Sequence, residues 1–114
     1  MVPRRKTKVS PPPELCPLRT CMAKLGGAWT PNIIWYLGAG ARRFTELKAD
    51  LGTVSAKVLT ARLRRMEAQG IVRREVLPTS PPTVEYSLTD LGRELQPAIA
   101  AIVAVGNRLK TRER

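Results

Sequence analysis

Short polar and basic side chains recur between residues 55 and 65 at spacings that place them on the outer faces of one helix. Ser55, Lys57 and Thr60 can donate hydrogen bonds to phosphate oxygens or to base edges. The apolar residues of the same segment fall within about 60° of one another on a wheel of about 100° per residue. This apolar stripe consists of Leu59, Leu63 and Met66. The segment therefore predicts a helix that is anchored by one stripe and presents its other faces to a polyanion.

The second group with reactive chemistry is the cysteine pair, Cys16 and Cys21. Residues five apart in a helix are separated by about 7.5 Å of rise, whereas a disulfide spans at most about 7 Å between Cα atoms. A bond between the two cysteines is therefore not expected. A helix start at Cys16 and the nearby Arg19 would favour a thiolate. Cys16 is thus a candidate oxidant sensor, with an inert and partly buried thiol as the equal alternative, while Cys21 is expected to pack.

The composition excludes several kinds of catalyst. The chain has 114 residues with 20 Lys or Arg, 9 Asp or Glu and no His, which gives a net charge of +11. Without His there is no Ser-His-Asp system and no imidazole acid–base group, and two cysteines cannot complete a four-ligand zinc site. We therefore predict no enzyme activity, no catalytic residue, no metal site and no cofactor.

The positive charge is concentrated within the chain. Residues 42–74 carry nine basic and three acidic groups, a net +6. A structured segment this basic is typical of nucleic-acid binding, and a solvated basic face without a partner is the alternative.

Length favours a single domain, since domains usually comprise about 100–200 residues. Residues 1–13 are polar and basic and end in three prolines, which predicts a disordered arm. Residues 14–110 are expected to form the folded domain, and 111–114 a basic tail. No apolar run approaches the roughly 20 residues that cross a bilayer, and no apolar stretch follows the basic N-terminus. We therefore expect a cytoplasmic protein with no membrane partner.

Two helices are predicted before residue 40. The first begins near Cys16 and Pro17, because Pro suits the first helical position, and Gly26-Gly27 ends it. Thr30 is expected to cap the second helix. Its apolar residues lie on nearly all faces, which predicts a central position. They are Ile33, Ile34, Trp35 and Leu37.

The remaining elements complete a recognisable order. A short third helix is predicted at 45–50, and a fourth at 55–69, where Ser and Gly provide the two caps. Alternating residues predict strands at 71–77 and 83–88, joined by a proline-rich turn. A last amphipathic helix covers 90–109. The order α-α-α-α-β-β-α, an α+β and mostly helical fold, is that of a winged helix-turn-helix.

Six short stretches occur in order between about residues 16 and 102 and are specific as a set. They are Cys16-Pro17, Gly26-Gly27-Ala28-Trp29-Thr30, Arg43-Phe44-Thr45-Glu46-Leu47, Ser55-Ala56-Lys57-Val58-Leu59-Thr60-Ala61-Arg62-Leu63, Gly70-Ile71-Val72-Arg73-Arg74 and Pro81-Pro82-Thr83-Val84-Glu85-Tyr86-Ser87-Leu88-Thr89, with Gly92. Together they resemble the HxlR-type transcriptional regulators, a MarR-related branch of the winged helix proteins. The resemblance implies a homodimeric, cytoplasmic repressor or activator that binds double-stranded DNA. Some members of that family use the Cys of Cys-Pro as a thiol sensor. Ala28 departs from the family's usual Lys, and the basic arm is longer than is typical.

In a helix-turn-helix the N-terminal half of the recognition helix enters the major groove, and flanking residues contact the backbone. The predicted DNA-contacting residues are Arg42, Arg43, Ser55, Ala56, Lys57, Thr60, Ala61, Arg64, Arg73 and Arg74. Strand alternation places Arg73 and Arg74 on opposite faces, so one of them is expected to be only a surface charge. Arg43 is alternatively structural.

Arg62 lies nearer the apolar stripe than its basic neighbours. An ion pair with Glu46 or Glu67 is as well supported there as a DNA contact.

The apolar side of the last helix and the first helix predict a dimer interface. Its expected residues are Leu18, Met22, Ile99, Ile102, Val103 and Leu109. An effector is also expected, either an oxidant acting at Cys16 or a small molecule in an apolar pocket around Trp29 and Trp35.

Two other classes compete with a dimeric repressor. A small basic RNA-binding structural protein fits the charge, although the few aromatic residues lie mostly in apolar patterns and offer no stacking surface. A thiol redox enzyme needs a second cysteine within reach, which the five-residue spacing opposes.

Overall fold

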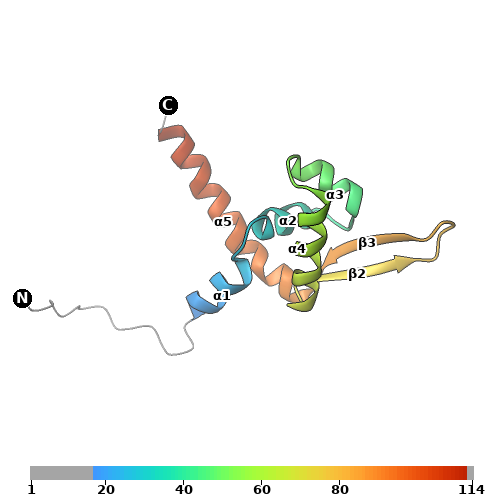
Figure 1. Cartoon of the computed structure of the whole chain (residues 1–114). Helices are drawn as coiled ribbons and strands as arrows, with labels where there is room; N and C mark the ends of the chain where they lie inside the picture. The colour runs from blue at the N-terminus through green and yellow to red at the C-terminus, as the bar shows by residue number, and fades with distance from the viewer. Residues whose placement is uncertain (1–16, 113–114) are drawn as a thin grey trace, which may run out of the picture.

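The computed structural model describes residues 17–112, and it is mostly helical with one small sheet (Figure 1). Its elements are α1 (Pro17–Leu25), α2 (Thr30–Leu37), β1 (Arg42–Arg43), α3 (Phe44–Leu51), α4 (Ala56–Ala68), β2 (Val72–Leu77), β3 (Thr83–Leu88) and α5 (Asp90–Arg112). The predicted arm at 1–13, Cys16 and the end of the tail lie outside the described residues. The winged helix-turn-helix fold is confirmed, with α3 and α4 as the helix-turn-helix and β2–β3 as the wing. The predicted order lacked β1, which consists of only two residues.

The sheet is antiparallel with the strand order β1-β3-β2. β1 pairs with the middle of β3, with Arg42 opposite Tyr86 and Arg43 opposite Glu85. A two-residue strand carries no periodicity of its own, because alternation needs at least four residues to show. Its existence therefore depends on the tertiary pairing with β3.

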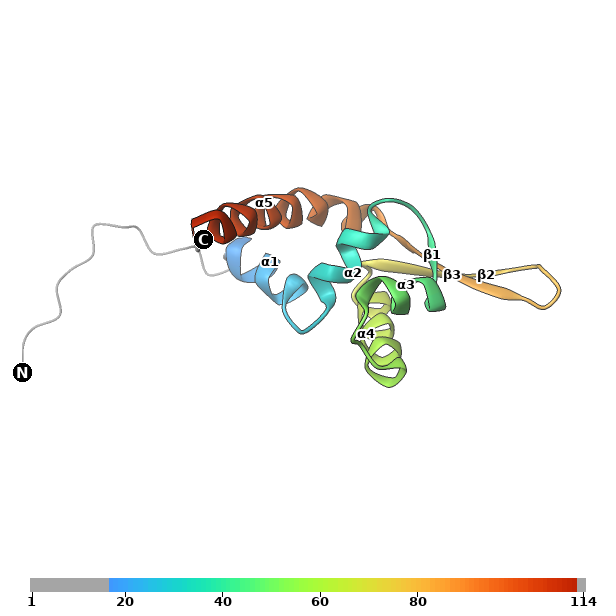
Figure 2. The same ribbon diagram turned by 90° about the horizontal axis from the view of Figure 1, so that it is seen from above.

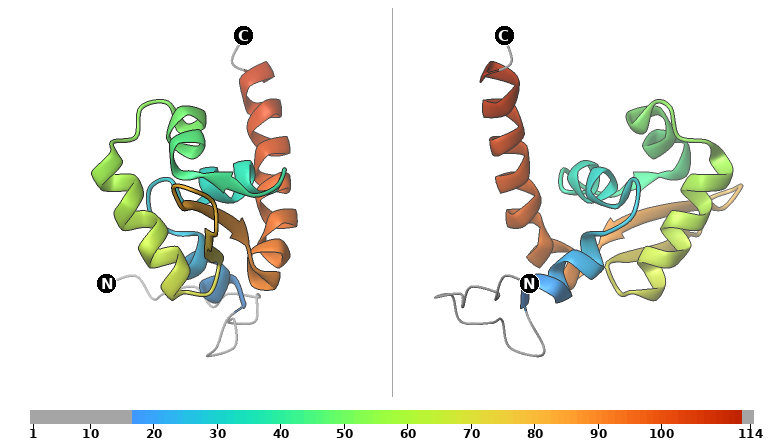
Figure 3. Two further views of the ribbon diagram at one scale, coloured as in Figure 1. Left: turned by 90° about the vertical axis from the view of Figure 1, so that its right-hand side faces the viewer. Right: turned by 60° about the vertical axis from the view of Figure 1, so that its left-hand side comes forward.

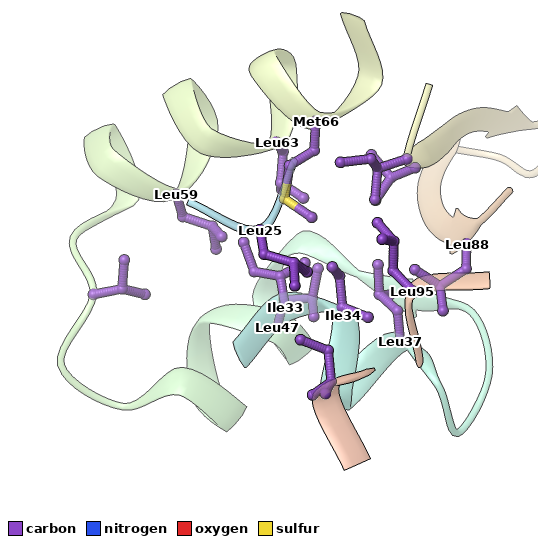
Figure 4. Close-up of a cluster of buried hydrophobic side chains, with 14 residues drawn as sticks. Leu25, Ile33, Ile34, Leu37, Leu47, Leu59, Leu63, Met66, Leu88 and Leu95 are labelled. Carbon is purple, nitrogen blue, oxygen red and sulfur yellow. The ribbon is translucent and has the colours of Figure 1, made fainter. Parts of the chain in front are cut away.

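A single hydrophobic core holds α4 against α2 and the base of the sheet (Figure 4). The predicted stripe of α4 is buried, with each side chain at most 1% exposed. Removing a buried leucine side chain typically costs about 2–5 kcal/mol of stability, so this stripe fixes the orientation of α4. The α2 residues that meet it are Ile33, Ile34 and Leu37.

The helix ends show where local signals succeeded and where one failed. Ser55 caps α4 as predicted, since its Oγ accepts a hydrogen bond from the Val58 amide at 3.1 Å. The prediction that Thr30 caps α2 is wrong. Trp29 occupies that position with a φ of 74°, and its carbonyl accepts from Ile33. Thr30 is the first residue of the helix and is buried, since it lies on the same helix face as the buried Ile33, Ile34 and Leu37.

As predicted, α2 is central, since it packs against α3, β3 and α5, but two of its aromatic side chains are not buried. Trp35 is 50% exposed and Tyr36 is 36% exposed. The core covers one face of α2 only, and α5 crosses another without covering these rings.

The elements define two sides of the molecule. Figures 2 and 3 show α4 on one side and α5 on the other, with α2 between them. The β2–β3 hairpin projects from the core beside α4 (Figure 2). Within residues 17–112, no helix is both long and apolar enough to cross a bilayer.

Candidate nucleic-acid interface

The outward faces of α4 present the predicted polar residues. Ser55, Lys57 and Arg64 are exposed, and Thr60 is partly buried. The Thr60 hydroxyl donates to the Ala56 carbonyl at 2.8 Å, so it offers lone pairs and a methyl group to a partner. The alanines of the set, Ala56 and Ala61, are also exposed. This combination suits a helix that approaches base edges closely, since small residues leave room for the longer basic side chains.

The register of the hairpin sorts the two wing arginines. Arg74 lies opposite Tyr86, and Arg73 lies opposite Ser87. Directly opposite residues of an antiparallel pair point to the same face of the sheet. The expected alternation is thus present, and the two guanidinium groups lie on opposite faces.

Arg74 and Tyr86 face α4. Together with three α4 residues they line a groove of about 440 Å³ between the helix and the sheet. The α4 residues are Thr60, Arg64 and Glu67. Glu67 and Tyr86 were not among the predicted site residues. The spacing of three between Arg64 and Glu67 marks a shared helix face, but Tyr86 could be found only from the hairpin register.

Arg42 is engaged within the protein, and its predicted contact with DNA stays a prediction. Its guanidinium bonds Asp50 Oδ2 from Nη2 at 2.7 Å and from Nε at 3.1 Å, and Nη1 lies 3.7 Å from Glu46 Oε2. The hydrogen bond to Asp50 raises the pKa of Arg42. These bonds hold α3 against β1, so the guanidinium is already satisfied within the protein.

The neighbouring Arg43 has the opposite character. It is exposed, and its backbone amide donates to Glu46 Oε1 at 2.9 Å at the start of α3. Among residues 17–112, no ion pair involves the Arg43 side chain. Arg43 is therefore more available than Arg42 for a phosphate.

Arg62 faces the turn between α1 and α2, and the predicted ion pair with Glu46 or Glu67 is not formed, whereas a DNA contact stays a prediction. No ion pair in the described part of the chain joins it to Glu46 or Glu67. A Cβ added at Gly27, where φ is +102°, would lie 2.7 Å from Arg62 Nη1. The Arg62 Nε is buried without a hydrogen-bond partner. The guanidinium thus packs on Gly27, a contact that local sequence could not reveal.

The far side of the molecule is apolar. Met22 and Ile102 are each 57% exposed, and Leu109 is 51% exposed. Val103 is partly buried, whereas Ile99 is 3% exposed and belongs to the core, which corrects its assignment to the interface. The side chain of Leu18 lies outside what the structure describes. Cys21 was expected to pack, but it is exposed on α1.

Two cavities of about 340 and 360 Å³ lie on either side of Trp35, between α2 and α5. Trp35 therefore lines pockets as expected. Trp29 lines neither of them and packs against the core instead.

The described residues hold no group of three or more His, Cys, Asp or Glu side chains that would bind a metal ion. The fold, the polar face of α4 and the wing define a winged helix-turn-helix protein with a nucleic-acid-binding surface.

The chain belongs to the HxlR-like helix-turn-helix family, whose family model matches residues 24–114. It is 37% identical over 99 residues to the transcriptional regulator YdeP of Bacillus subtilis, covering 87% of this chain and 77% of the relative. The reduced form of the redox regulator HypR superposes with a TM-score of 0.78 at 35% identity, covering 82% of this chain and 93% of HypR. Diamide-treated YodB from B. subtilis superposes with a TM-score of 0.70 at 34% identity, covering 83% and 95% of the two chains. The resemblance inferred from sequence is confirmed, and the protein is a helix-turn-helix transcriptional regulator.

Proposed function

We propose that the protein is a homodimeric repressor that binds a specific pseudo-palindromic duplex. The observation that carries this proposal is the division of α4, whose buried stripe fixes the helix while its polar and basic faces are exposed. Each α4 enters a major groove with its N-terminal half. The proposed contacts there are Ser55, Ala56, Lys57, Thr60, Ala61 and Arg64, with Arg43 and Arg74 on the flanking backbone.

The dimer follows from the apolar side of the molecule. Met22, Ile102 and Leu109 are each more than half exposed, and burying them against a second copy removes apolar surface from water. A two-fold dimer of this kind suits a pseudo-palindromic duplex whose half-sites lie about 34–36 Å apart. A dimer across two major grooves excludes other proteins from the same stretch of a promoter, which favours repression over activation. The proposed location of this activity is the cytoplasm.

The direct test selects duplexes from a random pool and compares the selected duplex with a scrambled one by fluorescence anisotropy. We expect preferential and salt-dependent binding by a dimer, with the dimer checked by light scattering. Equal affinity for both duplexes would exclude sequence-specific regulation. Tighter binding of single-stranded RNA than of any duplex would instead support the RNA-binding alternative.

A thiol response is a second part of the proposal. HypR is a redox regulator and YodB was examined after diamide treatment, and this chain has a Cys-Pro pair at Cys16 and Pro17. We expect diamide to change the DNA affinity of the wild type and of Cys21→Ser, but not of Cys16→Ser. Cys21→Ser is the matched control because it removes the neighbouring thiol. If diamide changes the DNA affinity of Cys16→Ser as much as that of the wild type, Cys16 is not the sensor. A small molecule that binds beside Trp35 would then be the favoured effector.

A further inference from the structure

The groove between α4 and the sheet gathers hydrogen-bond donors from three elements, α4, β2 and β3. Arg74 and Tyr86 form a cross-strand pair on the face of the sheet toward α4. Thr60, Arg64 and Glu67 line the opposite wall at helical spacings of four and three. Two guanidinium groups and a phenol therefore converge on one space, with a single carboxylate beside them.

The position of this groove decides what can enter it. In Figure 2, α4 lies on one side of the base of the sheet and the tip of the β2–β3 hairpin extends away from the core in another direction, so the two diverge from a shared base. If α4 lies in the major groove and the hairpin reaches the adjacent minor groove, the DNA strand that separates these grooves must cross the gap between helix and hairpin. The crossing segment is sugar-phosphate backbone, and phosphate oxygens and sugars together receive half to two-thirds of the hydrogen bonds in such interfaces.

We propose that this groove is a seat for one DNA backbone phosphate, held by Arg64 and Arg74 with the Tyr86 hydroxyl as a third donor. The inference rests on the proposed DNA binding and goes further by assigning one phosphate to named side chains. A planar guanidinium donates two parallel hydrogen bonds to phosphate oxygens. Arg42 shares this face of the sheet opposite Tyr86, but its bonds to Asp50 exclude it from the seat.

The negative charge of Glu67 beside the seat leads to a distinctive prediction. Within the described residues, no ion pair joins Glu67 to Arg64 or Arg74. Its negative charge therefore opposes an incoming phosphate instead of being neutralised by a bonded guanidinium. Glu67 lowers the affinity of the seat and so limits binding to duplexes that make no base contacts.

The first test removes the same charge from the two faces of β2. Arg74→Gln and Arg73→Gln are adjacent, and their side chains lie on opposite faces. We expect Arg74→Gln to weaken binding to the selected and the scrambled duplex alike by at least about tenfold. The slope of log K against log salt should fall by about two, because the dimer loses one phosphate contact in each half-site. Arg73→Gln is expected to weaken binding by less than about threefold with nearly the same slope.

The second test removes a negative charge. Glu67→Gln is expected to tighten binding to both duplexes by about threefold to tenfold, as a repulsive charge near the phosphate disappears. Glu75→Gln is the matched control, because Glu75 lies on the other face of the same sheet opposite Glu85. Tyr86→Phe removes only the hydroxyl and is expected to give a smaller loss than Arg74→Gln. Thermal unfolding of each variant establishes that it is folded.

The outcomes separate the seat from the function on which it rests. Wild-type protein without salt-dependent duplex binding would overturn both. Wild-type binding with equal losses in Arg74→Gln and Arg73→Gln would overturn the seat alone, since only general charge would then matter. Weaker or unchanged binding in Glu67→Gln would also overturn the seat, because the carboxylate would not face a phosphate.

Discussion

The two sides of this molecule use the same core for opposite purposes. On the α4 side, buried leucines hold a helix whose outer surface is small, polar and basic. On the α5 side, the helix buries Leu95 and Ile99 near its start and leaves Ile102, Val105 and Leu109 exposed farther along. One side thus presents the hydrogen-bond donors that suit a polyanion, and the other presents the apolar surface that we propose a second copy of the chain covers. The contrast shows that an exposed side chain indicates a kind of partner only when its chemistry is considered: exposed polar and basic groups suit a polyanion, and exposed apolar groups suit another protein surface.

The largest expected effect comes from the buried stripe that holds α4 on the core. Leu63→Ala removes a side chain that is 1% exposed, and we expect a loss of about 2–5 kcal/mol in the free energy of unfolding because of the cavity. Chemical denaturation measures the loss. Val58→Ala is the control on the same helix, since Val58 is 43% exposed, and its change should stay below about 1 kcal/mol. Equal losses in both would contradict the assigned orientation of α4.

The apolar side is tested by placing a charge on it. Ile102→Asp is expected to convert the dimer into a monomer and to lower DNA affinity by about a hundredfold, since two half-sites no longer act together. Light scattering and anisotropy measure the two effects. Val76→Asp adds the same charge to an equally apolar and 54% exposed position on the hairpin, and it should remain dimeric. A dimer in both variants would place the interface elsewhere.

The turn between α1 and α2 contacts α4 through Gly27 and the Arg62 guanidinium. Gly27→Ala forces a Cβ onto a residue with a φ of +102° and toward the Arg62 guanidinium. We expect a loss of about 1–2 kcal/mol from the left-handed backbone. Gly106→Ala is the control, because a Cβ there meets nothing within 4 Å and should stabilise the α5 helix by about 0.5–1 kcal/mol. Thermal or chemical unfolding distinguishes the opposite signs.

The polar side gives the smallest expected effect on a single residue. Lys57→Ala is expected to weaken the selected duplex by about tenfold, the equivalent of about 1.4 kcal/mol, while the unfolding midpoint stays unchanged because Lys57 is exposed. Lys48→Ala on α3 removes the same charge away from α4 and should weaken binding less. If Lys57→Ala weakens binding to the selected and the scrambled duplex equally, Lys57 contacts a phosphate instead of a base.

Much of the fold follows from local sequence. The buried stripe of α4 follows from helical periodicity, its start from a serine that accepts a backbone hydrogen bond, and its end from Gly70, which has a φ of +77°. The wing follows from alternation and from prolines that cannot continue a strand. The same ordered signals led to the family without any knowledge of contacts.

The errors share a different physical origin. β1, the burial of Thr30 and the exposure of Trp35 depend on which element packs against a residue, and periodicity within that residue's own element carries no such information. Proximity between Arg62 and Gly27 joins residues 35 positions apart. Arg42 and Arg43 are identical in type, and the pairing of β1 with β3 decides that the former bonds Asp50 while the latter stays exposed.

By itself the sequence determined the class of this protein, because helix caps, turn residues and hydrophobic periodicity act over a few residues. Only the tertiary structure decided which basic side chains are available and which surfaces lack a partner. The reason is that the free energy of a charged group depends on the neighbours that satisfy it, and those neighbours come from distant segments. The Arg74–Tyr86 pair facing Arg64 and Glu67 is the clearest case, since three separate elements meet there.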